Sequence, residues 1–274
     1  MIRYREKKYY CGEFMEVDIY PAYEQIKGKR KKLKNTTEVQ KKLNDHNRKK
    51  KLTRLLNSNF TDKDIKIELT YGADHLPESD EEADRELTNF LRRLKRFRKK
   101  KGLSDLKYIT VTEKGKRSGR YHHHCVLSGG VLPEEIRSIW GKGIIRLTPL
   151  DPGTQGLGAL ADYLTKNLTN GAIEDYKKAW HASKNLDQPK ERQSDSRISR
   201  RKAREIFENQ ECNSVYEDLY PDYHFSEIRA AYNEVNGQYY LCIQLYKKHD
   251  QYERRDRKHE SKNSSIKEGY RTRQ

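Results

Sequence analysis

The chain has 274 residues, with 58 Lys and Arg against 41 Asp and Glu, which leaves a formal net charge of +17. Only 33% of the residues are hydrophobic, below the roughly 45–50% apolar content of a typical globular domain. No stretch approaches the roughly 20 apolar residues that a membrane-spanning helix needs, and the first residues lack the apolar region of a signal peptide. We therefore expect a small core with charged segments, no membrane partner, and a polyanion as the binding partner.

The cysteines are widely scattered and form no CxxC pair, which argues against a zinc ribbon or a redox dithiol. Reduced thiols are the simplest interpretation, and they predict a cytoplasmic protein. The four cysteines are Cys11, Cys125, Cys212 and Cys242.

Two segments hold most of the positive charge. Residues 27–54 contain thirteen Lys or Arg against two acids, and residues 92–101 contain eight Lys or Arg and no acid. Blocks of this density favour contact with phosphate groups, although a basic segment can also be simply a solvated surface. The predicted DNA-binding residues come from these two segments: Lys29, Arg30, Lys31, Lys32, Lys49, Lys50, Arg92, Arg93, Arg96 and Lys99.

The first part of the chain alternates strand and helix patterns. A strand is predicted over 8–20, and weak helical spacing over 27–56 predicts a basic helix or arm. Residues 65–71 alternate strictly between apolar and polar side chains, which predicts a half-buried strand. The apolar residues of 79–101 form one stripe, which predicts an amphipathic helix.

A hairpin and two further helices follow. Strands are predicted over 106–113 and 120–128, joined by a turn, and a short helix over 133–140. A strand over 143–148 leads through a glycine-rich approach into a helix over 157–169. The order strand–helix–strand–strand–helix–strand–helix predicts an α+β fold, with a central antiparallel sheet and helices on one face.

Beyond residue 170 the pattern weakens. Residues 183–204 are polar and are predicted to form a loop, whereas 238–246 alternate and are predicted to form a strand that pairs with 8–20 and extends the sheet. Residues 247–274 have almost no apolar side chains and are predicted to be disordered. The predicted parts are an N-terminal strand with a basic arm, a core, an extension and a tail: 1–60, 61–170, 171–246 and 247–274.

Three consecutive histidines lie on the second strand of the predicted hairpin. His122 and His124 share one face because side chains alternate along a strand, and His123 points the other way. Two imidazoles at this spacing can hold one divalent cation; the alternative is a chance cluster of half-buried or surface histidines. Glu113, on the partner strand, could be a third ligand, but its face depends on the pairing register, which the sequence leaves open. Such a mixed site suits Mn²⁺ or Mg²⁺ better than a structural zinc ion.

The last predicted helix carries Tyr163 and Lys166, which are i, i+3 neighbours and so lie on one face. One interpretation is a tyrosine at the edge of the core beside a solvated lysine. The other is a tyrosyl nucleophile. A phenol with a pKa near 10 is weak at neutral pH, but a metal ion and an ammonium group favour its ionised form. Attack by the phenolic oxygen on a DNA phosphodiester would leave a phosphotyrosine and a free sugar hydroxyl.

Together these residues resemble the HUH endonucleases, in particular the single-tyrosine rolling-circle replication initiators of bacterial plasmids and filamentous phages. The sequence HHH at 122–124 is similar to the family's histidine–hydrophobic–histidine motif, and YLTK at 163–166 is similar to its tyrosine-and-lysine motif. IELTY at 67–71 resembles the first motif, and Glu113 stands where such proteins often place a carboxylate ligand. The resemblance covers roughly residues 60–170.

The resemblance implies a sheet similar to an RNA-recognition fold and a metal-dependent enzyme that nicks and rejoins single-stranded or hairpin origin DNA. Tyr163 would form a covalent 5′-phosphotyrosine, Lys166 would orient the phosphate, and Mg²⁺ or Mn²⁺ would be bound by His122, His124 and Glu113. The chain contains no G-x-x-x-x-G-K-[ST] motif, so a host helicase would unwind the duplex and a host DNA polymerase would extend the freed end. The expected location is the cytoplasm of a bacterial host cell.

The sequence departs from the family pattern in one respect, because the middle residue of the triplet, His123, is itself a histidine. Parity with Val126 favours His122 and His124 as the metal-binding pair. Two alternatives to a replication initiator stay open: a relaxase or transposase of the same chemistry, and a non-enzymatic DNA-binding regulator of replication. The sequence does not predict the oligomeric state.

Overall fold

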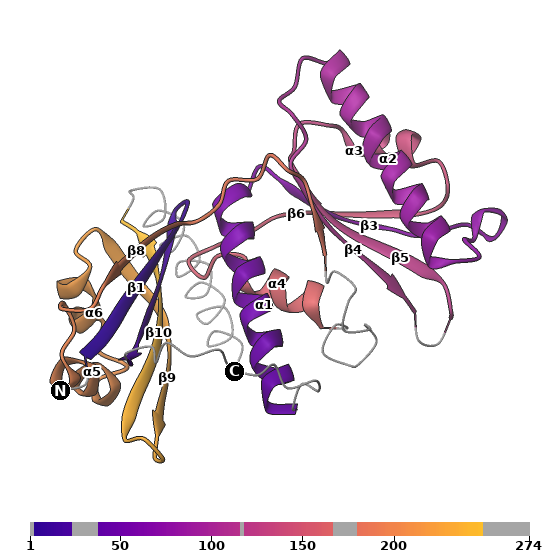
Figure 1. Cartoon of the computed structure of the whole chain (residues 1–274). Coiled ribbons are helices and arrows are strands. Elements are labelled where there is room, and N and C mark those ends of the chain that lie inside the picture. The colour runs from indigo at the N-terminus through magenta and orange to yellow at the C-terminus, as the bar shows by residue number, and fades with distance from the viewer. Residues whose placement is uncertain (1–2, 24–37, 116–117, 167–179, 249–274) are drawn as a thin grey trace, which may run out of the picture. The chain divides into compact units, whose positions relative to one another are not determined.

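The chain folds into two antiparallel sheets of five strands each and six α-helices over the residues that the structure, a computed structural model, describes (Figure 1). The predicted α+β class is therefore confirmed. The described residues are 3–23, 38–115, 118–166 and 180–248. The chain divides into two compact units: unit 1 comprises Met1–Ile26, Gly153–Gln155 and Lys190–Gln274, and unit 2 comprises Lys27–Pro152 and Gly156–Pro189.

The sheet of unit 2 has the strand order β6-β3-β5-β4-β7, and every neighbouring pair is antiparallel. The alternating segment 65–71 forms its second strand, and the predicted hairpin forms β4 and β5. The strands are β3 (Ile65–Leu69), β4 (Tyr108–Lys114), β5 (Tyr121–Leu127), β6 (Ile145–Pro149) and β7 (His181–Ala182). The helices are α1 (Glu38–Asn59), α2 (Asp80–Lys100), α3 (Pro133–Trp140) and α4 (Gly158–Thr165), with a 3₁₀ turn at Ala73–His75.

Helix α2 forms where its sequence supplies both a cap and an apolar stripe. The Ser79 side chain accepts a hydrogen bond from the Glu82 backbone N–H, acids fill the first turn and bases fill the last, as the helix dipole favours. Near its end, Arg98 is buried and donates to the backbone carbonyls of Ser128 and Gly129. The basic end of this helix is therefore attached to the segment that directly follows β5.

Helices cover both faces of the unit 2 sheet (Figure 1). On one face, α2 and α3 pack against β3 and β5 through a cluster that includes Leu69 and Cys125. On the other face, α1 and α4 pack against Val111 and Val126. The structure thus places helices on two faces rather than on one as predicted, because α1 contributes Leu52 to the core instead of projecting as an arm.

The sheet of unit 1 has the order β8-β1-β2-β10-β9, and its neighbouring strands are antiparallel. Residues 8–20 form parts of two strands rather than the single strand predicted, because the chain turns at Gly12, whose φ of 63° favours glycine. The strands are β1 (Arg3–Cys11), β2 (Phe14–Ala22), β8 (Lys190–Ser194), β9 (Tyr223–Asn233) and β10 (Gln238–Lys247).

The C-terminal strand of unit 1 pairs with the N-terminal hairpin, as predicted, but in a sheet separate from that of unit 2. The prediction of a loop over 183–204 is wrong, because these residues contain β8 and the start of a helix. The helices of this unit are α5 (Arg200–Glu208) and α6 (Asn213–Leu219). They bury Ile206 and Tyr216 against one face of the sheet. The predicted tail 247–274 lies outside the described residues except for its first two.

Among the described helices, none is both long and apolar enough to cross a membrane.

The strand end at Gly129 predicts a stability effect. A Cβ at this position would lie 1.9 Å from the Lys63 carbonyl oxygen, which belongs to backbone and cannot rotate away. We expect Gly129→Ala to destabilise the fold by about 1–3 kcal/mol. The matched control is Gly158→Ala, whose Cβ would meet nothing nearer than 3.9 Å and should be neutral or slightly stabilising. Urea unfolding of the two variants tests this, and equal midpoints would contradict it.

Candidate active site on the histidine strand

The register of three neighbouring strands brings four polar side chains to one face of the unit 2 sheet. Glu68 of β3 lies opposite His124 of β5, and Glu113 of β4 lies opposite His122. Residues directly opposite each other in a sheet share a face, and so do residues two apart on one strand. Glu113 therefore shares the face of the two histidines, which the sequence alone left open, and Glu68 joins them.

The four side chains form two close pairs of a histidine and a carboxylate. His124 Nε2 lies 3.4 Å from a Glu113 carboxylate oxygen, and His122 Nδ1 lies 3.7 Å from a Glu68 oxygen. The Nδ1 atom of His122 is buried and has no hydrogen-bond partner among the described residues. A buried ring nitrogen without a partner is costly, and nitrogen and oxygen donors of this kind fit a divalent cation. The residues present therefore suit the metal ion that the family implies.

Helix α4 brings Tyr163 to this group. Ala161 and Leu164 anchor the helix in the core, whereas the Tyr163 side chain is 42% exposed. Its hydroxyl lies 3.4 Å from His124 Nδ1, and the two rings meet edge to face, with centroids 5.2 Å apart. Lys166 is exposed and directly follows the last residue of the helix. A half-exposed phenol beside a histidine–carboxylate cluster is open to a substrate.

Charges around the phenol oppose one another. Partial burial raises the pKa of Tyr163, and the carboxylates of Glu68 and Glu113 raise it further, whereas Arg146 lowers it. The Lys66 ammonium lies over the Tyr163 ring, 4.4 Å from its centroid. Positive charge added beside the carboxylates would favour the ionised, nucleophilic phenolate.

The segment that carries this site is similar to a known family. Residues 64–168 match the family of replication-associated proteins of the ORF2 type. The match confirms the resemblance to HUH-type rolling-circle replication initiators over these residues. It supports a role in the initiation of DNA replication, a nuclease or strand-transferase activity, and binding to origin DNA. No curated protein and no solved structure matches the chain.

The middle histidine of this replication-associated segment has a structural environment. His123 is fully buried on the other face of the sheet, where its Nε2 lies 2.7 Å from the Tyr71 hydroxyl and its Nδ1 lies 3.0 Å from the Thr112 hydroxyl. Because Thr112 donates its proton to Asp84, the Nδ1–H of His123 donates to Thr112 and Nε2 accepts from Tyr71. Burial, with smaller contributions from His124 and its other neighbour, lowers the pKa of His123 to about 3.

His123 predicts how stability depends on pH. The folded chain takes up this proton only near pH 3, whereas the unfolded chain takes it up near 6.5, so stability falls as the pH drops through that window. The loss is at most about 1.4 kcal/mol per pH unit. We expect His123→Leu to cost about 1–3 kcal/mol at neutral pH, because Tyr71 loses its partner, and to reduce the acid sensitivity.

Urea unfolding at several pH values, without added metal, measures both effects. The control is His75→Leu, which removes an exposed histidine. If the stability curves of wild type and His123→Leu ran parallel from pH 7 to about pH 4, the buried neutral histidine would be contradicted.

The predicted DNA-binding residues fall into different environments. Lys29, Arg30, Lys31 and Lys32 lie outside the described residues. Lys49 forms an ion pair with Asp162 of α4, and the guanidinium of Arg93 donates to the carbonyls of Ile139 and Trp140. These two side chains therefore link elements within the fold.

The remaining predicted DNA-binding residues lie on α1 and α2. Lys50 is half-buried on α1, whereas Arg92, Arg96 and Lys99 are exposed on α2. Helix α2 covers the sheet face opposite Tyr163. The structure therefore does not bring the basic surface of α2 together with the histidine–tyrosine cluster.

Three residues of the cluster are not predicted from the sequence: Lys66, Glu68 and Arg146. Lys66 and Glu68 occupy the polar positions of the alternating strand 65–71, and Arg146 is directly opposite Glu68 on β6. The alternation could have placed them on a polar face. It could not have shown that this face is the one that carries His124, since the three strands pair only in the folded chain.

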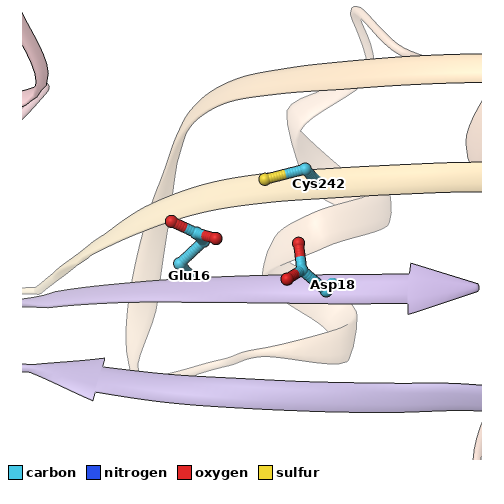
Figure 2. A group of neighbouring side chains, drawn as sticks. All are labelled: Glu16, Asp18 and Cys242. Atoms are coloured by element: carbon cyan, nitrogen blue, oxygen red, sulfur yellow. The ribbon is translucent and has the colours of Figure 1, made fainter. Parts of the chain in front are cut away.

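A second group of possible metal ligands lies in unit 1. Figure 2 shows Glu16 and Asp18 of β2 beside Cys242 of β10, and Asp18 and Cys242 are direct cross-strand partners. One ligand atom of each lies within 4.8 Å of the others, and no other such group of three occurs among the described residues. The ligand atoms of the histidine cluster are therefore more widely spread. Metal-binding experiments need to tell the two groups apart.

Proposed function

We propose that the chain initiates rolling-circle replication by nicking and rejoining single-stranded origin DNA at Tyr163. The observation that carries the proposal is the Tyr163 hydroxyl 3.4 Å from His124, on the sheet face that also holds His122 and Glu113. All four residues lie in the segment that matches the replication-associated family. A nucleophile, imidazoles and a carboxylate at one place are the groups that phosphodiester transesterification needs.

The proposed reaction exchanges one phosphate ester for another. The phenolic oxygen of Tyr163 attacks the scissile phosphorus and loses its proton. The bond between phosphorus and the 3′ oxygen breaks, and the expelled sugar oxygen takes up a proton and leaves as a free 3′ hydroxyl. The 5′ phosphate stays on Tyr163, and attack by a 3′ hydroxyl on this ester rejoins the strand. No bond energy is lost to water, so the reaction is reversible.

The proposed metal ligands are His122, His124 and Glu113. A bound Mg²⁺ or Mn²⁺ would polarise the phosphate and offset the carboxylate charge. Lys166, directly after the tyrosine helix, would orient the phosphate as a point charge. A host helicase and a host polymerase would act before and after the nick.

One assay tests the proposal. The full chain is incubated with Mn²⁺ and labelled single-stranded oligonucleotides tiled across the DNA that flanks its gene, with inverted repeats included as hairpins. The expected product is a protein–DNA adduct that survives denaturation, together with a released strand that ends in a 3′ hydroxyl. Tight DNA binding without any adduct would favour the alternative, a non-enzymatic regulator of replication.

A further inference from the structure

Two cations stand on one side of the histidine cluster. Lys66 lies two residues before Glu68 on β3, and Arg146 lies directly opposite Glu68 on β6. Glu113, by contrast, lies on β4, on the far side of β5. The sheet face therefore has a positive side toward β3 and β6 and a negative side toward β4.

Lys66 is held against the tyrosine. Its ammonium lies 4.4 Å from the centroid of the Tyr163 ring, a cation–π contact that fixes a charge beside the phenol. The Lys66 side chain is half-buried, so its ammonium is confined more than that of a lysine on an open surface. A phosphate approached by the phenolic oxygen would come close to this charge.

Arg146 offers more donors than its protein contact uses. Its Nη1 atom lies 3.6 Å from a Glu68 oxygen, which is longer than a hydrogen bond, and its side chain is 75% exposed. A guanidinium carries five N–H donors in a planar fork that matches two phosphate oxygens. Arg146 is therefore a charge at the rim of the site with its fork open to a ligand.

Resting on the proposed function, we propose that Lys66 and Arg146 bind the phosphodiester backbone of single-stranded DNA at the scissile bond. Arg146 would grip one phosphate through two hydrogen bonds, and Lys66 would hold a neighbouring phosphate as a point charge beside Tyr163. The DNA would then cross the β3–β6 side of the site and keep its phosphates away from Glu113. Lys66 and Arg146 would be DNA contacts in addition to Lys166.

Binding is measured without cleavage by placing each variant in a Tyr163→Phe chain. The probe is a fluorescein-labelled oligo(dT), followed by anisotropy between about 50 and 200 mM salt. We expect Lys66→Ala and Arg146→Ala each to weaken binding and to lower the salt slope by about 0.7, the value for one lost phosphate contact on a single strand. Arg146→Lys should keep the slope, because the charge remains. The matched control, Arg137→Ala, removes an exposed arginine from α3 and should change neither quantity.

Adduct formation is measured in the chain that keeps Tyr163. Here Arg146→Ala and Arg146→Lys should both slow the adduct by at least about ten-fold, because a point charge does not replace the fork. Unchanged salt slopes for both alanine variants, with an adduct at the wild-type rate, would overturn the inference and leave the proposed function intact. Lowered slopes in a protein that forms no adduct would support the phosphate site and contradict the nicking reaction. Arg146 is exposed, so its variants are expected to fold.

Discussion

Replacing Tyr163 by phenylalanine is expected to abolish the covalent protein–DNA adduct and to leave folding and DNA binding almost unchanged. The substitution removes one oxygen, whose described neighbour is His124 Nδ1 at 3.4 Å, and keeps the ring that packs under Lys66. Because 42% of the side chain is exposed, the loss leaves no buried cavity. Without the nucleophile the adduct rate should fall by at least about three orders of magnitude.

The control for this prediction is a second exposed tyrosine. Tyr232 on β9 is 44% exposed and lies in unit 1, outside the matched segment. Tyr232→Phe should form the adduct at the wild-type rate. A Tyr163→Phe chain that still formed the adduct would show that another group is the nucleophile.

The second large effect is expected from the two histidines. His122→Ala and His124→Ala should each weaken binding of Mn²⁺ by at least about 100-fold, because each removes an imidazole that we propose as a direct ligand; lost partners of ligands alone cost 10–100-fold. Nicking should be lost with the metal, whereas binding of single-stranded DNA should be kept. His122 tests this more cleanly, since it is half-buried and its Nδ1 has no hydrogen bond to lose among the described residues.

Metal binding needs its own readout and its own control. Titration calorimetry with Mn²⁺ and no DNA measures affinity independently of activity. Asp18→Asn alters the other ligand group, formed with Glu16 and Cys242, and should leave both the affinity at the histidine site and the nicking rate unchanged. If Asp18→Asn removed Mn²⁺ binding while His122→Ala did not, the metal assignment would be wrong.

Local patterns are enough to predict the elements that carry the site. The hairpin of β4 and β5 follows from alternation on both sides of a polar turn, and this alternation also places His122 and His124 together. The helix predicted over 133–140 has the bounds observed, because proline at its start and glycine after its end are strong local signals.

Pairing between distant segments cannot be predicted in the same way. Glu68 lies opposite His124 and Arg146, 56 and 78 residues away along the chain, and no local pattern specifies such a register. The same limit explains the separate sheet of unit 1, where β10 pairs with β2 across more than 200 residues. The helix α5 is not evident from the sequence because it buries only Ala203 and Ile206 within a polar stretch.

Charge density is the least reliable guide to function. The basic run 92–101 predicts DNA contacts, yet Arg93 and Arg98 use their guanidinium groups to bind backbone carbonyls. The cations beside the nucleophile, Lys66 and Arg146, are isolated in the sequence. A charge acts on a reaction through its distance from the reacting atoms, and the number of charges in a segment does not give that distance.

The most direct test of the tyrosine mechanism is to locate the covalent bond. The adduct formed with Mn²⁺ and single-stranded DNA is digested with nuclease and protease, and the modified peptide is sequenced by mass spectrometry. We predict a nucleotide joined through its 5′ phosphate to the oxygen of Tyr163. A nucleotide on any other residue, or cleaved DNA that carries a free 5′ phosphate and no attached protein, would contradict the mechanism.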